Sequence, residues 1–250
     1  DDVTAPVPNV AAIPDVSAEC SVTSLIAPTA TDNCAGTIIG THNATLPITS
    51  QGTTLVTWTY DDGNGNISIQ TQYVDINDVT PPVANDANLS DITSECSVAS
   101  LIAPTATDNC AGTITGTHNA SLPITTQGIT VVTWTYDDGN GNTSTQTQNV
   151  VINDVTGPIA DVVNLPTIVD TCSLSTLSAP TATDNCSGTI TGTHNATLPI
   201  TSSTVVTWTF DDGNGNITTQ DQNVSINQVN AFLIHVNDIT SVANDNLCVA

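Results

Sequence analysis

The sequence contains no lysine and no arginine, but it contains 24 aspartate and glutamate residues, so its formal net charge is −24. A chain without basic side chains cannot neutralise nucleic-acid phosphates, and an anionic lipid surface repels it. Nucleic-acid binding and electrostatic membrane binding are therefore excluded. No carboxylate can pair with a basic side chain of the same chain either. Wherever the fold gathers carboxylates, they need protons, solvent and salt, or a bound cation.

Other absences narrow the class of protein further. No apolar run reaches the ~20 residues that a membrane helix needs, so we expect no direct membrane insertion. No signal peptide opens the chain and methionine is absent, which indicates a processed product or a segment cut from a longer array. Only 10% of the residues are charged and 38% are hydrophobic, a composition too apolar for an acidic disordered tail.

The chain is a threefold repeat. Cys20, Cys96 and Cys172 recur at an interval of 76 residues. The same interval separates the members of two further sets, which are Cys34, Cys110 and Cys186, and His42, His118 and His194. The tryptophans Trp58, Trp134 and Trp208 follow the pattern with two residues fewer in the last step. We predict three repeats over residues 1–78, 79–154 and 155–228, followed by an atypical segment over 229–250.

Within a repeat the hydrophobic period is two, which is typical of β-strands. Val56, Trp58 and Tyr60 alternate with threonines, and after a Gly-Asn-Gly-Asn turn a second alternating strand begins at Ile67. Gly63 in this turn supplies the positive φ that a tight β-hairpin needs. Short strands with turn signals about every ten residues predict one β-sandwich per repeat. We expect an all-β fold of tandem sandwiches, with the tryptophans in their cores.

Two segments of each repeat resemble the hyalin-repeat (HYR-like) family. They are PTATDNC at residues 28–34 and VTWTYDDGNGN at residues 56–66, and both occur in order in all three repeats, with Phe210 in place of the tyrosine in the third. The resemblance implies immunoglobulin-like modules arranged in tandem as an elongated rod, as in adhesins of extracellular matrices and bacterial surfaces, without catalytic activity. The junctions at residues 75–78 and 152–154 are also similar to cadherin linkers. The third junction, Asn227-Gln228, departs from that pattern.

The immunoglobulin-like topology that the resemblance implies brings carboxylates together at the amino-terminal pole of each repeat. Hard oxygen ligands such as these suit Ca²⁺, which takes six to eight of them, so we predict calcium at the repeat junctions. The alternative is that these residues only form solvated turns. The predicted metal ligands are Asp2, Asp32, Asp61 and Asp62; Asp78, Asp108, Asp137 and Asp138; and Asp154, Asp184, Asp211 and Asp212.

The seven cysteines include no Cys-x-x-Cys pair, which indicates disulfides formed in an oxidising compartment. Because both cysteines always occur together in a repeat, pairing within the repeat is favoured, as Cys20–Cys34, Cys96–Cys110 and Cys172–Cys186, with Cys248 left over. An extended strand over residues 25–32 would, however, span about 26 Å at about 3.3 Å per residue. A disulfide requires Cα atoms within about 7 Å.

Pairing between repeats is the alternative. It joins Cys20–Cys110, Cys96–Cys186 and Cys172–Cys248, and it leaves Cys34 to bond a preceding unit or subunit.

The histidines recur a domain length apart and cannot form one catalytic cluster, so we expect no enzyme activity.

We therefore expect a secreted, cell-surface structural stalk or filament segment of an adhesin. Its expected partners are like subunits or further repeats, and surface glycans or other cells. Two alternatives stay open. The chain could be a filament subunit that assembles by strand complementation through residues 229–250, or it could be a glycan-binding module.

Overall fold

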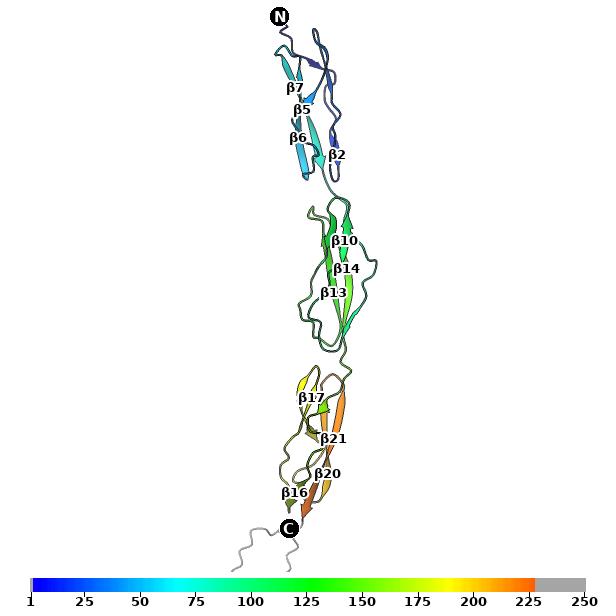
Figure 1. The fold of residues 1–250 in the computed structure, drawn as a ribbon, viewed down its shortest axis with the longest axis vertical. Coiled ribbons are helices and arrows are strands. Elements are labelled where there is room, and N and C mark those ends of the chain that lie inside the picture. The colour runs from blue at the N-terminus through cyan, green and yellow to red at the C-terminus, as the bar shows by residue number, and fades with distance from the viewer. Residues whose placement is uncertain (1, 228–250) are drawn as a thin grey trace, which may run out of the picture. The chain divides into compact units, whose positions relative to one another are not determined.

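The computed structural model describes residues 2–227, and all of the regular structure among them is β-strand (Figure 1). Each of the three repeats contributes seven strands. The first repeat contains β1 (Val7–Pro8), β2 (Val16–Ala18), β3 (Thr29–Asp32), β4 (Gly36–Ile39), β5 (Thr41–His42), β6 (Gly52–Asp61) and β7 (Ile67–Ile76). The second contains β8 (Val83–Ala84), β9 (Ile92–Ser94), β10 (Thr105–Asp108), β11 (Gly112–Thr115), β12 (Thr117–His118), β13 (Gly128–Asp137) and β14 (Thr143–Ile152). The third contains β15 (Ile159–Ala160), β16 (Ile168–Thr171), β17 (Thr181–Asp184), β18 (Gly188–Thr191), β19 (Thr193–His194), β20 (Thr204–Asp211) and β21 (Ile217–Asn227).

The chain divides into two compact units that do not coincide with the repeats. The first unit consists of residues 1–90, 101–120 and 131–148, so it contains the first repeat and part of the second. The second unit consists of residues 91–100 and 121–130 together with the chain from residue 149 onward. The repeat boundaries given above therefore remain a prediction.

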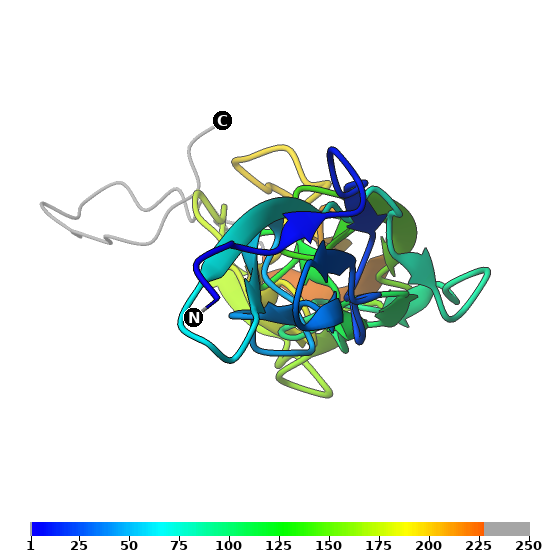
Figure 2. The ribbon, with the colours of Figure 1, turned by 90° about the horizontal axis from the view of Figure 1, so that it is seen from above.

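The first repeat is a sandwich of two sheets, with strand orders β1-β3-β4 and β2-β7-β6-β5. Its strands can be followed by their blue to cyan colours in Figures 1 and 2. The predicted hairpin is formed by β6 and β7, which pair antiparallel from Asp61 opposite Ile67 to Gly52 opposite Ile76. Strand β2 adds to the edge of β7 in parallel, with Val16 opposite Val74. The position of β2 is therefore determined by its pairing with β7 of the long hairpin.

The other repeats use the same pairings. The third repeat has sheets β15-β17-β18 and β16-β21-β20-β19. In the first unit, β10 pairs with β8 and β11, and β12 pairs with β13. In the second unit, β14 pairs in parallel with β9. Two mainly antiparallel sheets with a core between them form an immunoglobulin-like sandwich, here with one parallel edge pairing in the four-stranded sheet. The predicted fold class, all-β with tandem sandwiches, is confirmed.

A buried tryptophan lies at the centre of each repeat and is hydrogen-bonded to a glutamine, which is buried in the first and third repeats and partly buried in the second. Trp58 is 1% exposed and packs among Val56, Val74 and Ile76. Its indole Nε1 donates a hydrogen bond to Oε1 of Gln72 at 3.0 Å. The same bond joins Trp134 to Gln148 and Trp208 to Gln222. The glutamine gives the indole N–H of a buried ring a hydrogen-bond partner that it would otherwise lack. The predicted core role of the tryptophans is confirmed.

Close packing beside this tryptophan predicts the effect of one substitution. A Cβ added at the buried Gly40 would lie 3.0 Å from Cε1 of Tyr60 and 3.2 Å from the carbonyl oxygen of Pro28. Overpacking of this kind costs about 1–3 kcal/mol, more than the roughly 0.4–1 kcal/mol gained by restricting the unfolded chain. Gly40→Ala should therefore lower the free energy of unfolding measured in urea. Thr37→Ala, at an exposed position of β4, is the control, and equal stability of both variants and the parent would contradict the packing.

Candidate functional site

The turn between β10 and β11 holds an aspartate with one oxygen occupied and one free. Oδ1 of Asp108 accepts the backbone N–H groups of Cys110 and Ala111, both at 2.8 Å. Asp108 is 4% exposed, and its Oδ2 is buried without a hydrogen-bond partner. Asp32 and Asp184 occupy the same turn in the other repeats, each with an equally unpartnered Oδ2. A buried carboxylate oxygen without a partner is costly, so these three atoms require an explanation.

The hairpin between β13 and β14 supplies a second aspartate. Oδ1 of Asp138 accepts the backbone N–H groups of Asn140 at 2.7 Å and Asn142 at 3.0 Å, and Oδ2 accepts Nδ2 of Asn142 at 2.7 Å. Desolvation raises the pKa of Asp138, but these bonds outweigh it, so the pKa lies below its ordinary value. The pKa values of the equivalent Asp62 and Asp212 are also lowered. The hairpin carboxylates are therefore ionised at neutral pH.

The linker between the first two repeats supplies the third aspartate. Asp78 is 3% exposed. Its backbone N–H donates to Oε1 of Gln51 in the first repeat, and its Oδ2 accepts Nδ2 of Asn140 in the second. Asp154 repeats both contacts in the second unit, with Gln127 and Asn214. The linker aspartate is thus held by both of the repeats that it joins, through its backbone N–H on one side and its carboxylate on the other.

These three elements bring carboxylates together at each junction. One ligand atom each of Asp78, Asp108 and Asp138 lie within 4.8 Å of one another, and Asp154, Asp184 and Asp212 do the same in the second unit. The sequence offers no lysine or arginine to compensate them. The structure therefore places six of the predicted ligand residues in two acidic clusters.

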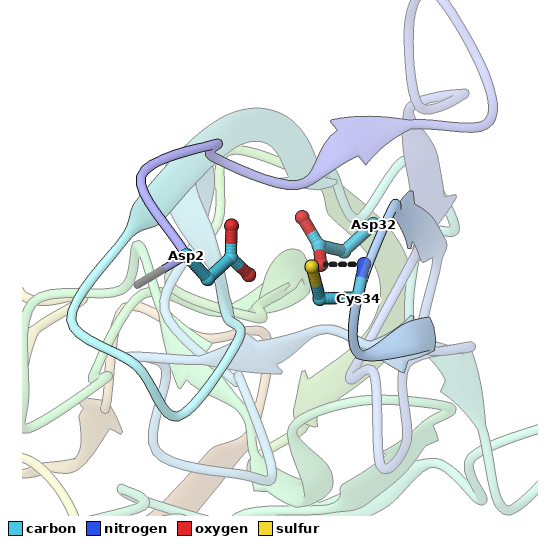
Figure 3. Close-up of side chains that lie close together, drawn as sticks. All are labelled: Asp2, Asp32 and Cys34. Atoms are coloured by element: carbon cyan, nitrogen blue, oxygen red, sulfur yellow. Dashed lines mark hydrogen bonds between the residues drawn. The ribbon is translucent and has the colours of Figure 1, made fainter.

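The first repeat carries a related cluster at the pole where its entry linker arrives. Asp2, Asp32 and Cys34 point toward one another (Figure 3), with one ligand atom each within 4.8 Å. Oδ2 of Asp2 and Oδ2 of Asp32 are both buried without a partner. Cys34 is an exposed free thiol. The negative charge of Asp2 is the main cause that raises the pKa of this thiol, with desolvation and Asp32 adding to it.

Four of the predicted ligands do not join these clusters, which are Asp61, Asp62, Asp137 and Asp211. Asp61, Asp137 and Asp211 are exposed, and their Oδ1 atoms accept the backbone N–H of the glycine two residues later. Each is the last residue of its strand, and neighbouring side chains of a strand point to opposite faces. Asp138 and Asp212, the second aspartates of their pairs, therefore face the clusters, whereas the first aspartate of each pair is a turn residue.

Two glutamates at the junctions were not among the predicted residues. Glu19 lies with Asp78 and Cys110 in a second group, and its Oε2 accepts Nδ2 of Asn109 at 2.6 Å and Oγ1 of Thr80 at 2.8 Å. Glu95 makes the same contacts with Asn185 and Thr156. These are the only glutamates of the chain, and each directly precedes a cysteine. This recurring Glu-Cys dipeptide was the sequence feature from which a place of both glutamates at the junctions could have been predicted.

The disulfides join consecutive repeats. Cys20 is bonded to Cys110 and Cys96 to Cys186, each with Cα atoms 4.9 Å apart. The favoured within-repeat pairing, as Cys20–Cys34, Cys96–Cys110 and Cys172–Cys186, is therefore wrong. The two observed bonds are ones that the between-repeat scheme predicted. The third bond of that scheme, Cys172–Cys248, lies outside the described residues.

The position of each cysteine in the sandwich explains this connectivity. Cys20 follows β2, whose residue Ala18 accepts a backbone hydrogen bond from Asn77 of the exit linker. Cys34 lies in the turn after β3, beside Asp2 of the entry linker. The two cysteines of one repeat therefore lie at opposite poles, and each is close only to a neighbouring repeat.

Comparison with known proteins supports the resemblance on which the site prediction rested. The chain is 35% identical over 211 residues to hyalin of Lytechinus variegatus and 35% identical over 214 residues to hyalin of Strongylocentrotus purpuratus. The chain is a homologue of hyalin. The alignments cover 76% of the chain but only 39% and 17% of the two hyalins, so the chain spans less than half of either relative. No protein-family profile matches it.

Solved structures show only distant similarity to this hyalin homologue. Domains EC22–24 of mouse cadherin-23 have a TM-score of 0.33 and 13% identity, with 90% of this chain and 99% of that chain covered. Immunoglobulin domains 1–5 of Sidekick-1 have a TM-score of 0.36 and 8% identity, with 92% and 60% covered. At these scores the similarity carries no argument about the site.

The charge of Asp2 beside Cys34 predicts the reactivity of the thiol. Asp2→Asn removes the main cause that raises the thiol pKa, so the thiolate fraction and the rate of alkylation at mildly alkaline pH should increase. The pH profile of iodoacetamide labelling at Cys34, followed by mass spectrometry, measures this. Asp15→Asn, at an exposed carboxylate outside this cluster, is the control. Identical profiles of both variants and the parent would contradict the electrostatic cause.

The lowered pKa of Asp62 predicts how stability depends on pH. The side-chain hydrogen bond from Asn66 is its largest cause. A carboxyl group whose pKa is depressed in the folded state stabilises the fold above its unfolded pKa, and this contribution is lost as the pH falls through the folded value. Asn66→Ala removes the donor, so acid unfolding should begin at a higher pH. Asn64→Ala is the matched control, because Asn64 contacts Asp62 through its backbone N–H, and equal acid transitions would contradict this role.

Proposed function

We propose that this hyalin homologue is a structural segment of an extracellular adhesion-type protein, in which calcium and disulfides together hold consecutive repeats. The observation that carries the proposal is the buried, unpartnered Oδ2 of Asp108 and of Asp184, each within an acidic cluster at a repeat junction. Since the chain spans only part of the hyalins that it matches, the role of the whole protein is part of the proposal.

The residues of the junction fit a calcium ion. Unit charges 4 Å apart repel by about 1 kcal/mol in water and about 4 kcal/mol near a protein surface, and the chain has no basic side chain to offset this repulsion. All the groups available are oxygens, which suit Ca²⁺; Mg²⁺ usually keeps several waters and uses fewer protein ligands. Asp78, Asp108 and Asp138 would hold the ion. Glu19 shares the environment of Asp78, whereas Cys110 is bonded to Cys20.

A cation at this place would couple the linker to the sandwich that follows it. Asp78 belongs to the linker, whereas Asp108 and Asp138 belong to turns of the second repeat. Extracellular calcium modules typically have dissociation constants of about 10⁻⁴–10⁻³ M, and a ligand at a hundredfold excess over its dissociation constant stabilises a fold by about 2.7 kcal/mol. Ion and disulfide would restrict rotation at the same junction, which suits a stalk or rod.

The disulfides and the composition of the chain agree with an extracellular location. Disulfides persist mainly in oxidising compartments, and the sequence offers no lysine or arginine to trypsin-like proteases. None of the described residues forms a helix that is long and apolar enough to span a membrane. Among residues 2–227, Tyr73 is the only exposed tyrosine, phenylalanine or tryptophan, so no observation favours a glycan-binding platform. Residues 229–250, through which strand complementation would take place, lie outside the described residues.

Thermal melting in calcium and in chelator tests the proposal with a matched pair of variants. Asp108→Asn keeps the Oδ1 acceptor of the turn and removes the charge, whereas Asp137→Asn removes an exposed carboxylate outside the cluster. We expect calcium to raise the melting temperature of the parent and of Asp137→Asn. For Asp108→Asn the calcium shift of this junction should be lost, while the melting temperature in chelator should rise, because repulsion is relieved.

The calcium response of Asp108→Asn separates a metal site from an ordinary turn. If Asp108 only closed its turn, Asp108→Asn would leave the calcium response unchanged. A parent protein whose melting temperature is the same in calcium and in chelator would contradict the proposal outright.

A further inference from the structure

Each of the two junctions consists of two complementary halves. The preceding repeat contributes a Glu-Cys dipeptide after its second strand, which is Glu19-Cys20 or Glu95-Cys96. The following repeat contributes the linker aspartate, the aspartate and asparagine of its TDNC turn, and the cysteine of that turn. These receiving residues are Asp78, Asp108, Asn109 and Cys110 at the first junction and Asp154, Asp184, Asn185 and Cys186 at the second.

The contacts between the halves are the same at both junctions. Nδ2 of Asn109 donates to Oε2 of Glu19 at 2.6 Å and lies 3.6 Å from Sγ of Cys20. Nδ2 of Asn185 makes the same two contacts with Glu95 and Cys96, at 2.7 and 3.6 Å. The asparagine therefore positions the incoming glutamate and cysteine together, next to the cysteine that receives them.

The first repeat presents a receiving half with the same residue types. Asp2, Asp32, Asn33 and Cys34 occupy the positions of the four receiving residues, one period earlier. Cys34 is a free, exposed thiol where Cys110 and Cys186 are bonded. Asp32 is 5% exposed, and its Oδ2 is buried without a partner beside that thiol (Figure 3). Asn33, the equivalent of the positioning asparagine, is exposed.

We propose that this pole of the first repeat is a covalent docking site for the far pole of another hyalin-type repeat that carries a Glu-Cys dipeptide. Cys34 forms the disulfide with the cysteine of that dipeptide, and Asn33 positions its glutamate. In the reaction the two thiols release two protons and two electrons to a disulfide oxidant of the oxidising compartment, which is reduced to two thiols. One S–S bond forms between the repeats while the S–S bond of the oxidant breaks.

The occupant is a Glu-Cys repeat rather than the third repeat of a second copy of this chain. The third repeat carries Thr171 at the position of Glu19 and Glu95, so it lacks the carboxylate that Asn109 and Asn185 bind. The neutral threonine would leave the amide of Asn33 without its charged acceptor. The inference needs no bound ion, so it stands or falls separately from calcium binding.

A chain extended by one repeat tests this docking. A copy of residues 1–76 placed directly before residue 1 keeps the period of 76 residues and presents a Glu-Cys dipeptide to Cys34 of the complete 250-residue chain. After oxidation in chelator, we expect iodoacetamide labelling of Cys34 to be lost. Peptic peptide mapping without reduction should show the cysteine of the added dipeptide bonded to Cys34. With Cys20→Ser in the added copy, Cys34 should stay labelled.

Two outcomes would overturn the inference. One is that Cys34 of the extended chain is labelled as fast as in the parent chain. The other is that the unextended chain forms disulfide-linked multimers that Cys34→Ser abolishes, because a Glu-Cys dipeptide would then not be required. Loss of labelling in chelator, combined with a melting temperature that calcium does not change, would support the docking site and contradict the calcium proposal.

Discussion

The junctions depend on one electrostatic constraint, which is that carboxylates are gathered in a chain that has no basic side chain. Asp108 illustrates the constraint, because one of its oxygens closes a turn while the other is buried without a partner. Hydrogen bonds from asparagine side chains and backbone N–H groups relieve part of the repulsion at Asp78 and Asp138. They supply no positive charge. A divalent cation would neutralise the cluster and use the remaining oxygen.

Covalent and electrostatic contacts meet at the same place in each junction. The disulfide of Cys110 lies beside Glu19 and Asp78, and Asp78 also belongs to the acidic cluster with Asp108 and Asp138. A disulfide limits how far the repeats can separate, and a cation held by the linker and the following repeat would limit how the linker rotates. The two contacts are therefore complementary rather than redundant.

Much of the fold follows from patterns that the sequence shows directly. Alternation around Trp58 and the glycine turn after it predicted the β6–β7 hairpin, and the period of 76 residues predicted equivalent sites. The site residues and the disulfide pairing were harder to predict, because the same sequence pattern is compatible with more than one arrangement. Adjacent side chains of a strand point to opposite faces, and the sequence does not tell which face meets the junction, so the prediction did not separate Asp137 from Asp138, and only Asp138 joins the cluster. Glu95 belongs to no local motif, and the disulfides depended on which pole each cysteine occupies.

Counting bound calcium is the most direct test of the central claim. Equilibrium dialysis with radioactive calcium should find at least the two ions per chain that correspond to the clusters of Asp78, Asp108 and Asp138 and of Asp154, Asp184 and Asp212. Half-saturation should fall at about 10⁻⁴–10⁻³ M. A chain that binds no calcium in this range would contradict the account, because its junction carboxylates would then be tolerated without a cation.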